Sequence, residues 1–151
     1  MLQIERVFGE VLGYTGPAGG SADYTLRRES LVQVDGKVAD AALGKFSTDD
    51  ATTLFRVAVE GKGPTDPLDL PFKNRKKSAV DQALGYAVNF PCDWYLVTNL
   101  NELRLYHKGH DQFTFERFET KVVATDDDAF RRFAFLLGAP RVVLADGTCH
   151  L

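Results

Sequence analysis

An acidic and a basic residue, Glu60 and Lys62, stand two positions apart at the end of the apolar stretch Leu54 to Val59. The β-branched and apolar residues of that stretch predict a buried strand. Side chains two positions apart on a strand project from the same face, so the Glu60 carboxylate and the Lys62 ammonium are expected to share one space. A carboxylate can hold a divalent cation and an amine can steady a water that is losing its proton. The pattern therefore suits metal-assisted hydrolysis.

Asp40 supplies a second acid from the segment before that strand. We predict strands over Leu31 to Val34 and Val38 to Phe46 around a turn at Asp35-Gly36, with Asp40 in the second strand. If this second strand pairs with the one that ends at Glu60, the two carboxylates meet at the edge of a sheet.

Two carboxylates and the main-chain carbonyl of Gly61 would offer a metal ion hard oxygen ligands and leave room for water, as Mg²⁺ prefers. A bound cation would also relieve the repulsion between the ionised Asp40 and Glu60. We therefore expect Asp40, Glu60 and Gly61 to bind Mg²⁺, with Mn²⁺ as a substitute, and Lys62 to hold the attacking water.

A helix is predicted after Ser78, which resembles an N-cap with Asp81 three residues later. Its apolar face is expected to carry Val80, Leu84 and Val88, with two polar residues four positions apart on an adjacent face, Gln82 and Tyr86. If this helix docks beside the acids, the Gln82 amide can contact a phosphate or a base. The Tyr86 phenol can pack there or support the site.

The N-terminal residues 2 to 12 have apolar side chains at helical spacing, and the helix is expected to close near Gly13. On the helical wheel Glu5 lies beside the apolar stripe and can reach inward, whereas Glu10 lies further round and faces water. Residues 24 to 31 are ambiguous, and a short helix is one interpretation.

The rest of the chain completes an α/β pattern. Strands are predicted over Trp94 to Thr98 and Leu103 to His107, with a further strand around Phe113 and Phe115. A last helix is predicted over Asp126 to Leu137, and the tail from Gly138 has no assignment. A single domain, residues 1–151, built as a central mixed sheet flanked by helices is the natural packing for this order.

The net charge is −3, which is an unusual balance for a nucleic-acid-binding protein that acts alone. Cys92 and Cys149 lack the spacing of a metal site, and no apolar run is long enough to cross a membrane. We therefore expect reduced thiols and a cytoplasmic protein. One basic run could touch phosphates, at Lys73, Arg75, Lys76 and Lys77.

The order Asp40, Glu60-x-Lys62 and Gln82-x-x-x-Tyr86 resembles the motif set of the PD-(D/E)xK nucleases. The wider context, residues 4 to 106, is similar to the N-terminal nuclease domain of type IIG restriction–modification enzymes. Ala39 stands where the nominal pattern has a proline, a variation that the motif tolerates, and Gly61 fills its middle position.

The resemblance implies a restriction-endonuclease-like αβββαβ core and Mg²⁺-dependent hydrolysis of phosphodiester bonds in double-stranded DNA. It also implies a glutamate on the first helix as a further acid, and Glu5 fits this role best, with Glu10 as the substitute. Enzymes of this type continue into methyltransferase and target-recognition domains, so we expect the chain to be a fragment of a longer protein. Cleavage of both strands would need two copies, hence a transient dimer.

Two other functions remain open at this point. The same fold could serve a DNA repair or junction-resolving nuclease. Alternatively, it could be a catalytically inactive DNA-binding or assembly module.

Overall fold

The computed structural model describes residues 2–17, 23–28, 33–34, 37–47, 53–89 and 92–143. It contains eight strands in those ranges, β1 (Asp23–Arg28), β2 (Gln33–Val34), β3 (Lys37–Val38), β4 (Ala41–Ser47), β5 (Leu54–Gly61), β6 (Trp94–Thr98), β7 (Glu102–His107) and β8 (Phe115–Glu119). The helices there are α1 (Leu2–Glu5), the π-helix η1 (Arg6–Val11), α2 (Ala79–Asn89), α3 (Thr120–Thr125), α4 (Asp127–Leu137) and α5 (Ala139–Val142).

Six of the strands form one mixed sheet in the order β1-β4-β5-β6-β7-β8. All neighbouring pairs are antiparallel except β5 and β6, which run parallel and are connected through α2. A parallel pair needs a crossover connection, and α2 provides it across one face of the sheet. The expected α/β architecture with a mixed sheet is confirmed.

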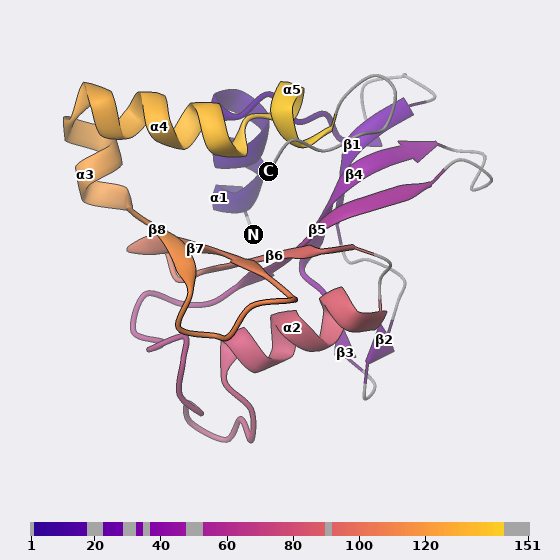
Figure 1. Ribbon diagram of the computed structural model, residues 1–151, viewed down its shortest axis with the longest axis vertical. Coiled ribbons are helices and arrows are strands. Elements are labelled where there is room, and N and C mark those ends of the chain that lie inside the picture. Colours follow the sequence, from indigo (N-terminus) through magenta and orange to yellow (C-terminus); the bar gives the residue numbers. More distant parts are fainter. Residues whose placement is uncertain are drawn as a thin grey trace.

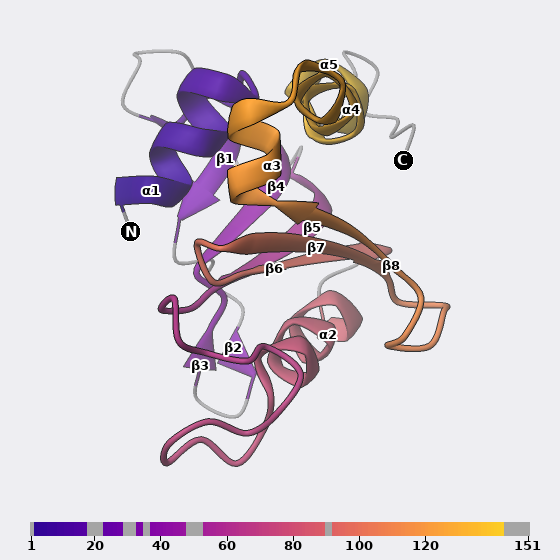
Figure 2. The ribbon, with the colours of Figure 1, turned by 90° about the vertical axis from the view of Figure 1, so that its left-hand side faces the viewer.

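Helices cover both faces of this sheet (Figure 1). On one face lie α1, α4 and α5, and on the other lies α2 with the small β2–β3 hairpin, as the turned view also shows (Figure 2). Each face has its own apolar core. Phe8, Leu96 and Leu137 belong to the first core, and Ala58, Val80 and Tyr95 belong to the second.

Local sequence explains where the helices near the site begin and end. Gly13 follows the N-terminal helix with a φ of 79°, a left-handed conformation that glycine adopts without steric cost. At the start of α2 the Ser78 hydroxyl accepts a hydrogen bond from the Asp81 amide at 3.0 Å, and the Ser78 amide donates to the Asp81 carboxylate at 3.2 Å. This reciprocal cap fixes the N-terminus of α2 and confirms the predicted helix start.

Several sequence-based expectations need correction. Residues 23–28, within a segment that allowed a short helix, form the edge strand β1 because Leu26 pairs with Leu43 of β4. Asp40 does not lie in a strand, since it occupies a bend between β3 and β4. Residues 31–32 and 35–36 of the predicted hairpin lie outside the described residues.

The buried face of α2 also differs from the prediction. Val88 is 66% exposed, whereas Gln82, Ala83 and Tyr86 are buried. The small side chains of Ala79, Ala83 and Ala87 allow this face of α2 to approach the sheet closely. Gln82 and Tyr86 lie on the same buried face.

The C-terminal strands and helices differ from the prediction in three places. Phe113 lies in a turn and is 92% exposed, so the last strand begins only at Phe115. The short helices α3 and α5 were not predicted, whereas α4 matches its predicted range, with the Asp126 carboxylate capping the Ala129 amide at 2.7 Å.

Candidate functional site

The ends of three adjacent strands define the candidate site. Ala41 pairs with Val59 across the antiparallel β4 and β5, so the preceding Asp40 lies next to Glu60. Gly61 pairs with Thr98 across the parallel β5 and β6. Because β5 is flanked on both sides, its C-terminal end is held in a fixed position. The register thus places Asp40 and Glu60 at the ends of neighbouring strands, near enough for the Asp40 charge to act on Glu60.

Asp40 is fixed by the main chain of β5. Its Oδ2 accepts a hydrogen bond of 2.8 Å from the Gly61 amide. A Cβ atom at position 61 would lie 3.6 Å from this oxygen and 2.9 Å from Cδ1 of Ile4 in α1. A side chain at this position would therefore displace the end of Ile4, so glycine lets the helix approach the strand end closely.

Glu60 projects from β5 toward α2, on the face opposite to the one where position 61 meets Ile4. Its side chain is 4% exposed and forms an ion pair with Lys62, whose side chain is 20% exposed. The Lys62 amide donates to the Thr98 carbonyl at 2.7 Å, which extends the β5–β6 pairing by one residue. The two side chains share one face, as their spacing predicts.

The environment of Glu60 favours its protonated form. Burial, and then the neighbouring Asp40 carboxylate, raise the pKa of Glu60 from 4.5 to about 7, although Lys62 and Arg75 oppose this increase. One carboxylate oxygen, Oε2, is buried without a hydrogen-bond partner among the described residues. Such an unpaired acceptor is costly unless a ligand or ion satisfies it.

Helix α2, which packs on the sheet beside the end of β5, contributes two polar side chains, Gln82 and Tyr86. Burial and the Glu60 and Asp40 carboxylates raise the pKa of Tyr86 to about 12, so the phenol lies within their electrostatic field. Gln82, one turn nearer the N-terminus of α2, is 8% exposed, and its Oε1 is buried without a partner in the described part of the chain. Both predicted residues therefore lie on the sheet-facing side of the helix.

Glu5 takes a different place from the other acids. Its carboxylate pairs with NH1 of Arg28 on β1 at 2.7 Å, and both side chains are more than a third exposed. Ile4, its neighbour, is the residue of α1 that approaches Gly61. Glu10 is exposed on η1, the helical segment that follows α1.

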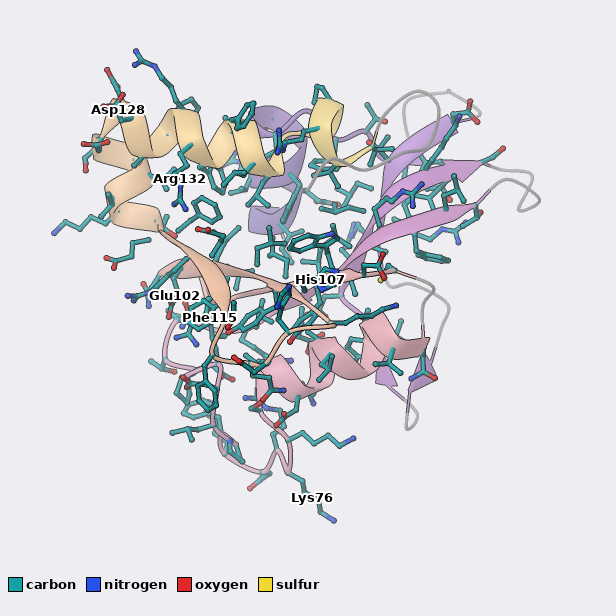
Figure 3. The ribbon with its side chains drawn as sticks, viewed as in Figure 1. Lys76, Glu102, His107, Phe115, Asp128 and Arg132 are labelled. Carbon is teal, nitrogen blue, oxygen red and sulfur yellow. The ribbon has the colours of Figure 1, made fainter. Side chains whose placement is uncertain are left out.

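The basic run splits into two groups. Lys73, Lys76 and Lys77 are exposed, and Lys76 projects away from the body of the protein (Figure 3). Arg75 instead turns inward, where its NH2 lies 3.0 Å from Oδ1 of Asp66 and its Nε donates to the Lys77 carbonyl at 2.7 Å. Arg75 therefore organises the loop, whereas the lysines remain accessible.

Asp66 is a third carboxylate near the site that sequence reasoning did not single out. It is 4% exposed and accepts a 2.9 Å hydrogen bond from the Leu68 amide. Burial alone would raise the pKa of Asp66, but hydrogen bonds from Arg75 and Leu68 hold it below its ordinary value, and the Lys62 charge lowers it further. The Asp66–Arg75 pair spans nine positions of an irregular loop, so no periodicity could have indicated it.

A cavity of about 410 Å³ lies on the opposite face of the sheet. Its lining is mainly apolar and includes Ile4, Val7, Leu103 and Phe130. Such a lining does not suit a phosphate or a metal ion, so the polar site at the end of β5 is the better candidate for chemistry.

Among the described residues no helix is long and apolar enough to cross a membrane, and no group of three or more His, Cys, Asp or Glu side chains could hold a metal. Comparison with family models, with curated proteins and with solved structures gives no significant match for this chain. A functional assignment therefore depends on the geometry of the site.

Proposed function

We propose that this chain is a Mg²⁺-dependent endonuclease domain that hydrolyses phosphodiester bonds in double-stranded DNA. The observation that supports this proposal most is the convergence of Asp40, Glu60 and Lys62 at the end of β5. A restriction-endonuclease-like αβββαβ core is part of the same proposal. The first helix, three antiparallel strands, α2 and the parallel β6 occur in that order along the chain.

The residues present fit a divalent cation. Glu60 offers a buried carboxylate oxygen that lacks a partner in the described part of the chain, and the pKa of Glu60 is raised by burial and by Asp40, as expected for two acids that share a cation site. We propose Asp40, Glu60 and the Gly61 carbonyl as the protein ligands, with water completing the shell. When bound, the ion would polarise the scissile phosphate and offset charge on the leaving oxygen.

The protein side chains then have separate roles. Lys62 donates a hydrogen bond to the attacking water and stabilises it as hydroxide, because its ammonium already lies beside Glu60. The attacking water gives its proton to solvent, its oxygen forms one P–O bond as another P–O bond breaks, and solvent supplies a proton to the leaving oxygen. Gln82 would position the phosphate, and Tyr86 would pack beside the two acids.

Two further parts of the proposal concern DNA and partners. The exposed Lys73, Lys76 and Lys77 would contact the DNA backbone, whereas Arg75 is committed to Asp66. Because Glu5 is paired with Arg28, a role as a further acid would require this exposed pair to open. Methyltransferase and target-recognition domains, and a transient dimer for cleavage of both strands, complete the proposal.

Cleavage of supercoiled plasmid and linear duplex DNA with Mg²⁺ or Mn²⁺ tests the proposal. We expect Lys62→Ala to reduce the cleavage rate by about 10²-fold or more, since it removes the group that steadies the water. Asp40→Asn should abolish cleavage and weaken Mg²⁺ binding. Arg132→Ala, which removes a surface pair with Glu116 on the other side of the sheet, serves as the control.

Retention of cleavage by Lys62→Ala or Asp40→Asn would refute the assignment. Preference for branched DNA would instead favour a repair or junction-resolving nuclease. A protein that neither cleaves DNA nor shows a Mg²⁺-dependent change in melting temperature would be an inactive module.

A further inference from the structure

Two buried carboxylates, Glu60 and Asp66, lie near enough to Lys62 for its charge to lower the pKa of each. Glu60 and Asp66 each have a side chain that is 4% exposed, and Lys62 lies between them in the sequence. A tight turn, in which the Asp66 amide donates to the Gly63 carbonyl at 3.1 Å, brings the Asp66 main chain back to the residue that follows Lys62. The positive charge of Lys62 acts on both acids, on Asp66 less strongly than Arg75 does, and the two acids can therefore compete for it.

Arg75 removes Asp66 from this competition. Its NH1 and NH2 atoms both donate to the Asp66 carboxylate, an arrangement of two parallel hydrogen bonds that satisfies both oxygens. The Arg75 side chain is only 13% exposed, so solvent weakens this pair little. With Asp66 neutralised, Lys62 is paired with Glu60.

The loop around this pair is firmly attached to the sheet. The Asn99 amide group donates to the Asp66 carbonyl at 2.7 Å, and the Asn101 amide group donates to the Pro64 carbonyl at 2.8 Å. Leu68 is completely buried in the core under α2. The main chain that carries Asp66 is therefore held in place if the Asp66 charge loses its partner.

We propose that Arg75 is a positioning residue that neutralises Asp66 and thereby keeps the Lys62 ammonium on Glu60, where the hydrolytic water is held. Loss of the Arg75 charge leaves a buried carboxylate four residues from Lys62. The lysine then moves to Asp66 and away from the reacting groups. The catalytic part of this inference rests on the proposed nuclease function, whereas the position of Lys62 does not.

The test uses Arg75→Gln, which removes the charge but keeps amide donors for Asp66. A crystal structure of this variant should show the Lys62 Nζ within hydrogen-bond distance of Asp66 instead of Glu60. In the plasmid assay kcat should fall by about 10²-fold with little change in KM, because a misplacement of about 1 Å costs that much. A lysine that stays on Glu60 would overturn the proposal, whether or not the protein cleaves DNA.

The double variant Asp66→Asn/Arg75→Gln separates positioning from a simple structural role. Without the Asp66 charge nothing draws Lys62 away, so Lys62 should return to Glu60 and kcat should recover to within about threefold of the wild type. If the Arg75–Asp66 pair had only a structural role, kcat of the double variant would be at least as low as that of Arg75→Gln. This result would contradict the proposal. If Arg75→Gln does not fold, the double variant decides the question alone by the same two measurements.

Arg104→Gln is the matched control. Arg104 is as buried as Arg75, pairs with the buried Glu102 at 2.8 Å and reaches Asp69 of the same loop at 3.3 Å. Glu102 also pairs with Arg117. Because no catalytic lysine lies between these groups, we expect kcat to stay within about threefold of the wild type. A loss of kcat equal to that of Arg75→Gln would show that loosening of the loop is sufficient, and would overturn the proposal.

Discussion

Glu60 has two properties that motivate its proposed role as a metal ligand. It lies deep enough for burial to raise its pKa to about 7, and it keeps one oxygen without a partner among the described residues. Sequence spacing alone placed Glu60 and Lys62 on one face, and the β4–β5 register places Asp40 beside the end of β5. The commitment of Arg75 to Asp66 could not be read from the sequence, because a loop has no regular geometry to relate two side chains.

We predict that Glu60→Gln stabilises the protein at pH about 8 while abolishing cleavage. The folded state binds the Glu60 proton more tightly than the unfolded state does, so wild-type stability falls as the pH rises from 4.5 to about 7. This loss amounts to about 3 kcal/mol at most, and glutamine avoids it. Urea unfolding without metal should show the gain at pH about 8 and not at pH about 4.5. An equal effect at both pH values would contradict this account.

The loop between β5 and α2 is the element that gives the site its surroundings. Its inner side holds Asp66 and Arg75 and its outer side carries Lys73, Lys76 and Lys77. The sequence predicted a basic run here, but it did not predict that Arg75 turns inward while the lysines face outward. The N-terminus of α2 was predicted correctly from Ser78 and Asp81, because a cap depends on residues only three positions apart.

We predict that the outer lysines contribute uniformly to DNA binding. Changing Lys73, Lys76 and Lys77 together to Gln should weaken binding to all duplex sequences. It should also make the dependence of log K on log salt shallower by about 0.9 for each phosphate that the protein no longer neutralises. Binding measured by fluorescence anisotropy at several salt concentrations tests this, with Lys121→Gln on α3 as the control for net charge. An unchanged salt slope would place the DNA on another surface.

At the scale of the whole molecule, N-terminal and C-terminal segments together cover the face of the sheet on which α1, α4 and α5 lie. The Tyr14 hydroxyl donates to the Leu137 carbonyl at 2.8 Å, and the Ala139 amide donates to the Leu12 carbonyl at 2.8 Å. These bonds join the segment after η1 to the end of α4, across more than a hundred residues. They hold the helix whose Ile4 packs against Gly61.

We predict that Tyr14→Phe destabilises the protein without altering the site directly. It leaves a buried carbonyl at the end of α4 without its partner, which costs about 1–3 kcal/mol. Chemical denaturation measures this loss, and Mg²⁺ affinity, measured well below the melting temperature, should remain within about twofold of the wild type. A large loss of Mg²⁺ affinity would mean that the packing of α1 and α4 sets the positions of the proposed metal ligands.

The sequence by itself determined what depends on neighbours along the chain: the strand that carries Glu60 at its end, the start of α2 and the range of α4. The periodicities of strands and helices and the helix caps depend on residues close together in the chain, so they can be predicted from the sequence. Only the tertiary structure decided that residues 23–28 pair with β4, that α2 buries Gln82 and Tyr86, and that Glu5 meets Arg28. These outcomes depend on which distant surfaces come together, and packing between elements overrides local preference there.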